Sequence, residues 1–154
     1  MAGTIEKKLD VLGIALPTPL APIANYVGYV RVGQTLFVSG QLCIAGGEMV
    51  AKGKLGDGVT VEQGQAAARA CAINLLAQVK LALGDLDKVS RIVRLGGFIN
   101  STANFLEASV VMNGASDLMV EVFGDKGRHA RTAVSVPALP ADAAAEVDGI
   151  FEVA

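Results

Sequence analysis

An arginine and a glutamate near the C-terminus are the residues of this chain best placed to do chemistry. Arg131 opens the run RTAVSV, and Glu146, fifteen positions later, opens the run EVDGIFEV. Because the side chains of a strand alternate between its faces, Arg131 shares a face with Ala133 and Ser135, which are both small. A guanidinium with small neighbours has room to bind a carboxylate through two parallel hydrogen bonds. The alternative is an edge-strand arginine paired with an acidic neighbour, and spacing alone favours that alternative.

The carboxylates of the last run fall on one side of an expected strand. Glu146, Asp148 and Glu152 share a face, whereas the mostly apolar residues between them take the other face. Carboxylates are usually solvated. Only the one that lies opposite Arg131 is therefore a candidate for catalysis.

The remaining reactive residue types exclude several kinds of site. His129 is the only histidine, which excludes a pair of histidines acting as acid and base within one subunit, and most zinc geometries. Cys43 and Cys71 lie in apolar stretches without CxxC spacing, so we expect buried, reduced thiols. The sequence also lacks the Walker and GxGxxG glycine loops. We therefore predict neither a metal nor an organic cofactor.

Two helices are expected to support these residues. The clearest runs over 61–83, where apolar residues recur at helical spacing; Thr60 and Gln63 form a capping box before it, and a glycine follows it. A second helix is expected over 113–123, with Asn113 as its N-cap. A short amphipathic helix is expected within residues 1–16.

The expected strands alternate with these helices. A hairpin precedes the long helix, one strand buried on both faces at Ile92, Val93 and Leu95 follows it, and two strands end the chain. The assigned ranges are 27–32, 35–40, 89–99, 131–136 and 146–153, and a third strand before the long helix would bring the total to six. Three prolines before the hairpin predict an extended lead-in.

Length and composition indicate one domain over residues 1–154, with residues 1–20 as an N-terminal extension. The chain is 52% hydrophobic, which excludes disorder, and its net charge of −2 offers no general attraction for nucleic acid or an anionic membrane. No apolar run is expected to be long enough to span a bilayer, and the first residues lack the hydrophobic core of a signal peptide. The expectation is a cytoplasmic protein that contacts no membrane.

The order of elements predicts the fold class. It is an α/β two-layer sandwich, in which two helices cover one face of a mixed six-stranded sheet. Apolar residues assigned to the other face would form a large exposed patch, so we expect self-association. These residues are Leu36, Val38, Val134 and Val147.

Two blocks of sequence resemble a known family. The C-terminal block contains Arg-Thr-Ala-Val from Arg131, then Leu-Pro, then Glu-Val-Asp from Glu146. It resembles the C-terminal signature of the RidA/YjgF family of small imine deaminases. The upstream block, Tyr26-Val27 followed by a strand that ends in Ser39-Gly40-Gln41, resembles the N-terminal part of the same family. Together the two blocks span most of residues 22–153.

The resemblance implies a chorismate-mutase-like fold and a homotrimer with three clefts at the subunit boundaries. It implies that Arg131 binds the substrate carboxylate and that Glu146 positions water. Tyr26 would close one wall, and Ser39 and Gly40 would shape the floor. Asn113 would line the cleft, an alignment that requires an insertion within residues 100–112. Ala133 departs from the family, in which cysteine is common at that position.

The implied activity is hydrolysis of small 2-imino or enamino acids to a 2-oxo acid and ammonia, without a cofactor. The expected partner is thus a small metabolite that carries a carboxylate. Two alternatives stay open: a module that binds such a metabolite without turnover, and an endoribonuclease. The acidic pI, the single histidine and the few aromatic residues argue against the endoribonuclease, so nucleic acid is not an expected partner.

Overall fold

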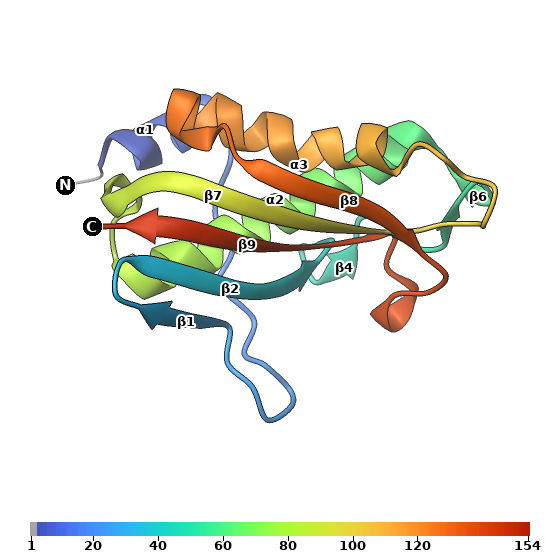
Figure 1. Cartoon of the computed structure of the whole chain (residues 1–154), viewed down its shortest axis with the longest axis horizontal. Helices are drawn as coiled ribbons and strands as arrows, with labels where there is room; N and C mark the ends of the chain where they lie inside the picture. The colour runs from blue at the N-terminus through green and yellow to red at the C-terminus, as the bar shows by residue number, and fades with distance from the viewer. Residues whose placement is uncertain (1–2) are drawn as a thin grey trace.

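A five-stranded mixed sheet forms one layer of the molecule and two helices form the other (Figure 1). The computed structural model describes residues 3–154. The strand order is β1-β2-β9-β7-β8, and only the β7–β8 pair is parallel. The main elements are α1 (Thr4–Val11), β1 (Tyr29–Val32), β2 (Thr35–Leu42), α2 (Val61–Leu83), β7 (Val89–Asn100), α3 (Ala108–Phe123), β8 (Ala130–Val136) and β9 (Ala145–Val153). The chorismate-mutase-like architecture expected from the sequence is therefore confirmed.

The sheet has one strand fewer than expected. Within the described residues, the stretch with Pro17, Pro19 and Pro22 joins no ladder, since proline cannot donate the backbone hydrogen bonds that a strand requires. The glycine-rich connection after β2 forms only two-residue pieces outside the main sheet. They are β3 (Ile44–Ala45), β4 (Glu48–Met49), β5 (Lys54–Leu55) and β6 (Gly58–Val59).

Helix α2 has the boundaries that its capping signals predict. The Thr60 hydroxyl accepts a hydrogen bond from the Gln63 backbone N–H (3.1 Å), and the Gln63 side chain accepts one from the Thr60 N–H (2.9 Å). Gly84 closes the helix in the left-handed conformation, with φ 76°. Contrary to expectation, α2 is long and apolar enough to cross a membrane. It is nevertheless the core helix of this sandwich, with 61% of its most apolar window buried.

Helix α3 begins at Ala108, five residues earlier than predicted. Asn113 is therefore inside the helix and does not cap it. The reason is packing: Val111 and Met112 are fully buried and extend the apolar face that Ala115 and Leu118 continue. Burial of this longer apolar face determines where the helix begins, and the capping preference of Asn113 does not.

The open face of the sheet carries apolar groups beside charged residues, and these apolar residues differ from those expected. Leu36, Val38 and Val147 are buried beneath the helices, and of the four expected residues only Val134 is exposed on the other side. The alternation of each strand places different residues on the open face. Cross-strand pairing aligns them in two groups: Val30, Phe37 and Ile150; and Phe98 with Val134.

One further residue of β7 was assigned to the wrong environment. Val93 was expected in the core, yet 41% of it is exposed. The pairing of β7 with β9 shifts register between Ile92 and Arg94. At such an irregularity one residue has no direct partner on the neighbouring strand, and here Val93 lies at that position. Ile92 and Leu95 are fully buried, as predicted.

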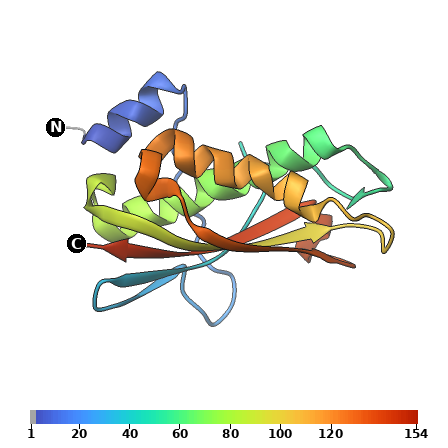
Figure 2. The same cartoon turned by 45° about the horizontal axis from the view of Figure 1, so that its top comes forward.

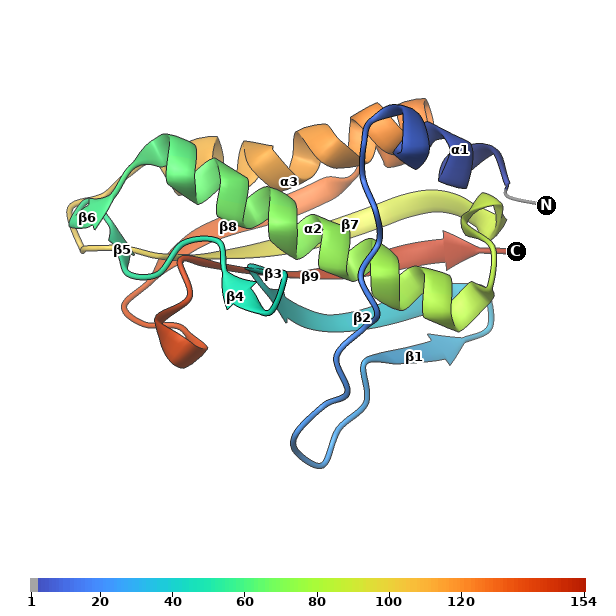
Figure 3. The same ribbon diagram turned by 180° about the vertical axis from the view of Figure 1, so that it is seen from behind.

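The N-terminal segment runs over the helical layer. Helix α1 is shorter than the predicted amphipathic stretch, residues 1–2 of which lie outside the described residues. Its start is fixed by Asp87, whose carboxylate accepts from the Thr4 and Ile5 backbone N–H groups, each at 2.8 Å. Residues 13–28, which we call the strap, then cross α2 to reach β1 (Figure 3). Figure 2 shows α1 outside the helices and the sheet below them.

Candidate functional site

Arg131 lies on the edge strand β8 and reaches toward α3. One guanidinium nitrogen, Nη1, donates to Asn113 Oδ1 (2.9 Å) and to Ser116 Oγ (3.1 Å). The other, Nη2, donates to the Ser109 carbonyl (3.1 Å). The early start of α3 thus places Asn113 one turn into the helix, where it contacts Arg131. The resemblance had assigned both residues to one cleft, and the structure brings them together.

The acceptors around Arg131 are neutral. Among residues 3–154, no carboxylate lies within salt-bridge distance of this guanidinium, so the alternative of an ion-paired edge arginine is wrong. An arginine has five N–H donors. Three are used here, which leaves Nε–H and one Nη2–H. The side chain is therefore oriented, half-buried, positively charged and able to bind an external carboxylate.

A hydrogen-bond relay extends from Arg131 to the only histidine. Ser116 Oγ accepts from Arg131 and lies 2.9 Å from His129 Nε2, while His129 Nδ1 lies 2.6 Å from the Gly127 carbonyl. Because a carbonyl can only accept, Nδ1 carries the proton and the neutral ring accepts the Ser116 hydroxyl at Nε2. Burial lowers the pKa of His129; the Gly127 hydrogen bond raises it, and the charge of Arg131 lowers it. The hydrogen bonds from Arg131 through Ser116 to His129 therefore involve the neutral form of the imidazole.

Glu146 lies on the open face of the sheet, half-buried against Gly40. A side chain at Gly40 would collide with the Glu146 carboxylate, so the glycine is needed for this close approach. Burial raises the pKa of Glu146, and the charge of Asp148 on the same face raises it further. A carboxylate with a raised pKa beside an open surface is suited to exchange a proton with water.

Arg131 and Glu146 lie on opposite faces of the sheet. Arg131 pairs with Leu95 of β7, a core residue, whereas Glu146 pairs with Phe98. Leu95 and Phe98 are three positions apart, so their side chains leave opposite faces of the strand. Within one copy of the chain, Glu146 therefore does not face Arg131.

The upstream residues of the candidate site gather at the other edge of the sheet. Ser39 and Gly40 lie where the pairing of β2 with β9 is interrupted, between Val38 and Gln41. The Ser39 hydroxyl donates to the Val27 carbonyl at 2.6 Å and so ties the strap to β2. Tyr26, in the strap, is 57% exposed. These residues form one half-site with Glu146, and Arg131 with Asn113 forms a second half-site on β8 and α3.

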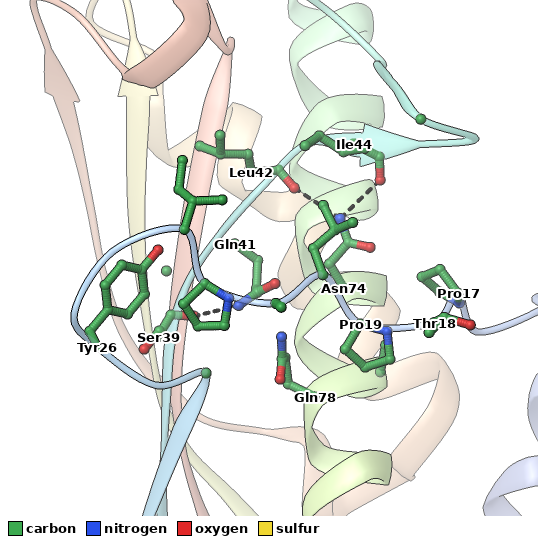
Figure 4. A pocket seen from close by; sticks show the side chains of 18 of the residues that line it. Pro17, Thr18, Pro19, Tyr26, Ser39, Gln41, Leu42, Ile44, Asn74 and Gln78 are labelled. Atoms are coloured by element: carbon green, nitrogen blue, oxygen red, sulfur yellow. Dashed lines mark hydrogen bonds between the residues drawn. The ribbon is translucent and has the colours of Figure 1, made fainter.

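A cavity of about 500 Å³ lies beside the first half-site, between the strap, β2 and α2 (Figure 4). Tyr26, Ser39 and Gly40 lie at its border. The side-chain amides of Gln41, Asn74 and Gln78 also line it, and sequence reasoning missed them. The available signal was a polar residue, Gln78, in the otherwise apolar stripe of α2.

A third group of acidic side chains, Glu6, Asp85 and Asp87, brings carboxylate oxygens within 4.8 Å of one another near the N-terminus. Most of these oxygens have structural partners. Asp87 caps α1, and Glu6 Oε1 accepts from Lys80 Nζ (2.7 Å) and from the Leu86 N–H (3.0 Å). The cluster thereby anchors α1 to the rest of the fold.

Comparison with known proteins connects this geometry to a family. The family model described as "YjgF/chorismate mutase-like, putative endoribonuclease" matches residues 6–152. This chain belongs to that family. Membership supports a role in the processing or binding of small molecules.

Relatives within the YjgF family match nearly the whole chain. Protein TCP17 of Trypanosoma cruzi is 53% identical over 154 residues, covering 98% of this chain and 95% of the relative. The crystal structure of Atu1372 from Agrobacterium tumefaciens, a protein of unknown function, is 46% identical with a TM-score of 0.92, covering 97% and 92% of the two chains. A putative endoribonuclease from Shewanella oneidensis is 36% identical with a TM-score of 0.94, covering 98% of this chain and all (100%) of that structure.

Proposed function

We propose that this protein is a hydrolytic deaminase that converts small 2-imino or enamino acids into 2-oxo acids and ammonia. The observation that supports the proposal is the set of hydrogen bonds made by Arg131. Three neutral oxygen atoms accept from its guanidinium, which therefore keeps its positive charge and two free N–H donors. A small carboxylate is the ligand that fits such a group.

Glu146 supplies the acid–base chemistry in this proposal. It removes a proton from water as the water oxygen attacks the imine carbon, and it passes that proton to the imine nitrogen, which gives a tetrahedral carbinolamine. It then takes the proton of the carbinolamine hydroxyl and delivers it to the amino nitrogen. The C–N bond breaks as the C=O bond forms, and ammonia leaves a 2-oxo acid behind. The raised pKa of Glu146 brings proton transfer closer to neutral pH. The cycle uses no metal and no organic cofactor.

The two half-sites are combined by assembly. Arg131 and Glu146 lie on opposite faces of the sheet, Arg131 on the edge strand β8 and Glu146 on the central strand β9, so the complete site that we propose combines Arg131 of one copy with Glu146 of another. A head-to-tail ring provides this arrangement, because it presses one edge of each copy onto a different surface of the next. We propose a homotrimer with three such clefts. The exposure of Ile23 in the strap (100%) and of Leu106 in the connection between β7 and α3 (89%) supports contacts with another copy at these two places.

Tyr26, Ser39 and Gly40 then have distinct roles. Tyr26 covers the substrate from the strap, and Gly40 leaves room for the Glu146 carboxylate. Ser39 acts mainly by holding the strap in place through Val27. A cytoplasmic location is part of the proposal and is supported by two free, buried cysteines, Cys43 and Cys71.

The test is an assay in which an amino-acid oxidase generates the 2-imino acid and semicarbazide competes to trap it. The deaminase should reduce semicarbazone formation and increase 2-oxo acid and ammonia. Binding of pyruvate or 2-oxobutyrate without any effect on imine loss would favour the metabolite-binding alternative. Cleavage of RNA that survives Arg131→Ala would favour the endoribonuclease that the family description names.

A further inference from the structure

We propose that the cavity under the strap is a second binding site, which takes a small uncharged molecule with a carboxamide or lactam group. It lies on the helix side of β2, whereas Glu146 lies on the open side. The two sites share only the border residues Tyr26, Ser39 and Gly40. The proposal stands on contacts within one copy of the chain and does not depend on the deaminase activity.

Gln78 is the residue that indicates a ligand. It is 4% exposed, it lines the cavity, and its side chain makes no hydrogen bond with any of residues 3–154. Figure 4 shows its amide at the wall between α2 and the strap. The amide is not sealed inside the core, because the one fully buried side-chain atom without a partner among the described residues is Glu6 Oε2; the Gln78 amide is still reachable from the cavity. Amides that are so little exposed usually have a hydrogen-bond partner. A ligand in the cavity would supply the missing donor and acceptor.

Two neighbouring amides have fixed orientations. Asn74 Nδ2 donates to the carbonyls of Leu42 and Ile44, each at 2.9 Å, and Gln41 Nε2 donates to the Ser39 carbonyl at 3.0 Å. Because carbonyls cannot donate, these bonds identify the nitrogen of each amide. Asn74 Oδ1 and Gln41 Oε1 remain as acceptors. A ligand with N–H donors can bind these oxygens, and its own carbonyl can accept from Gln78.

The lining also determines the charge and shape of the ligand. None of the residues that line the cavity is ionisable near neutral pH, so a charged ligand would lose its hydration without an opposite charge. Much of the rest of the wall is apolar and includes Leu20 of the strap and Ile44 of β3. A volume of about 500 Å³ suits a small ring that carries the amide.

The strap is built to keep this cavity open. Pro17, Pro19 and Pro22 restrict its backbone, and the Ser39 hydroxyl holds it at Val27. Gly28 is the other requirement, because a Cβ there would lie 2.6 Å from Gln78 Oε1. Any other residue at position 28 would displace the Gln78 amide, which we propose as a contact of the ligand. A preformed site of this kind loses little conformational freedom on binding.

The experiment compares probes of the same shape with different charge. Binding of benzamide, benzoate and benzamidinium to the full chain is followed by isothermal titration and by backbone NMR shifts. We expect benzamide to bind, with shifts at Asn74 and Ala77, and benzoate to show no binding there. Equal binding of benzoate, or no binding of benzamide, would overturn the proposal.

A substitution at Gln78 tests its role directly. Gln78→Glu keeps the shape of the side chain but replaces the amide with a carboxylate. We expect benzamide affinity to fall at least about tenfold and benzamidinium to become the preferred probe. The control, Gln63→Glu on the same helix, preserves the capping box and should bind the probes as the native chain does. If Gln78→Glu does not fold, Gln78→Met replaces it and should also lose benzamide; unchanged benzamide affinity in the folded variant would refute the assignment.

Discussion

Arg131 is oriented by oxygen atoms that do not neutralise it. A carboxylate partner would hold the guanidinium equally well but would compete with a substrate carboxylate for the same positive charge. Asn113 is the clearest example, because its amide has the shape of aspartate without the charge. The arrangement separates the positioning of the arginine from its charge, which is what a carboxylate-binding site requires.

Arg131→Ala and Arg131→Lys should both abolish most turnover of small imino acids. Lysine keeps the charge but lacks the planar fork that makes two parallel hydrogen bonds. Loss of this contact should lower kcat/KM by about 30- to 1000-fold, equivalent to roughly 2–4 kcal/mol. The melting temperature should change little, since Arg131 is only half-buried on an edge strand. Collapse of the fold in Arg131→Ala would show that the arginine is structural.

Glu146→Gln should abolish most of the proposed imine hydrolysis and stabilise the protein. The folded chain holds the pKa of Glu146 above its ordinary value, so the ionised carboxylate destabilises the folded state once the pH exceeds the folded pKa. Glutamine removes that charge with little change in shape. Turnover should fall by about 100-fold or more, while the melting temperature at pH 7 rises. A lower melting temperature would mean that the carboxylate has a stabilising partner.

His129 should make stability and carboxylate binding depend on pH. Its folded pKa lies below the ordinary value, so on acidification the unfolded chain takes up a proton before the folded chain does. The free energy of unfolding is thus unaffected by His129 at a pH above the pKa that this residue has in the unfolded chain. It decreases as the pH falls below that pKa. Protonation also removes the acceptor of the Ser116 hydroxyl and so disturbs Arg131. Between about pH 7.5 and pH 5, melting temperature and substrate affinity should fall less in His129→Gln than in the native chain; parallel profiles would exclude this role.

At the scale of elements, the close contact between α2 and α3 determines where the Arg131 ligands lie. Gly114 sits directly against the backbone of Gln65 in α2, and an added Cβ would collide with that backbone. Asn113 and Ser116, on either side of Gly114, both bind Arg131. The separation of the helices therefore controls the position of the guanidinium, although neither helix belongs to the sheet that carries it.

Gly114→Ala should disturb both the packing and the site. A methyl group at this contact pushes the helices apart, which should destabilise the fold by roughly 1–3 kcal/mol in denaturant unfolding. Carboxylate affinity should also weaken, because Asn113 and Ser116 move with α3. Asp117→Ala, at an exposed position of the same helix, is the matched control and should be close to neutral. An unaffected carboxylate affinity in a destabilised Gly114→Ala would show that Arg131 is positioned independently of α3.

At the scale of the whole molecule, the proposed trimer covers the open face of the sheet and combines the separated half-sites. We expect light scattering at low micromolar concentration to report three subunits. Phe37→Asp places a charge in the apolar open face and should give monomers without imine hydrolysis. Val11→Asp, at an exposed apolar position on α1, should remain trimeric. A monomeric native protein would remove the basis for the shared site.

Local signals in the sequence determined much of this protein. The capping box and Gly84 defined both ends of α2, and strict alternation defined the two faces of β9, because both features depend on residues close in the chain. The two motif blocks also supplied most of the residues of the two proposed half-sites. These conclusions needed only the geometry of a helix and a strand.

Tertiary structure decided the other features, because they depend on packing contacts between residues that are distant in the sequence. The start of α3 was set by burial of Val111 and Met112, and the exposure of Val93 by an irregular pairing of β7 with β9. The face of Glu146 relative to Arg131 depends on the register of three strands, which no single strand encodes. The cavity at Gln78 exists only because the strap crosses α2, which brings together residues far apart in the chain, such as Pro17 and Gln78.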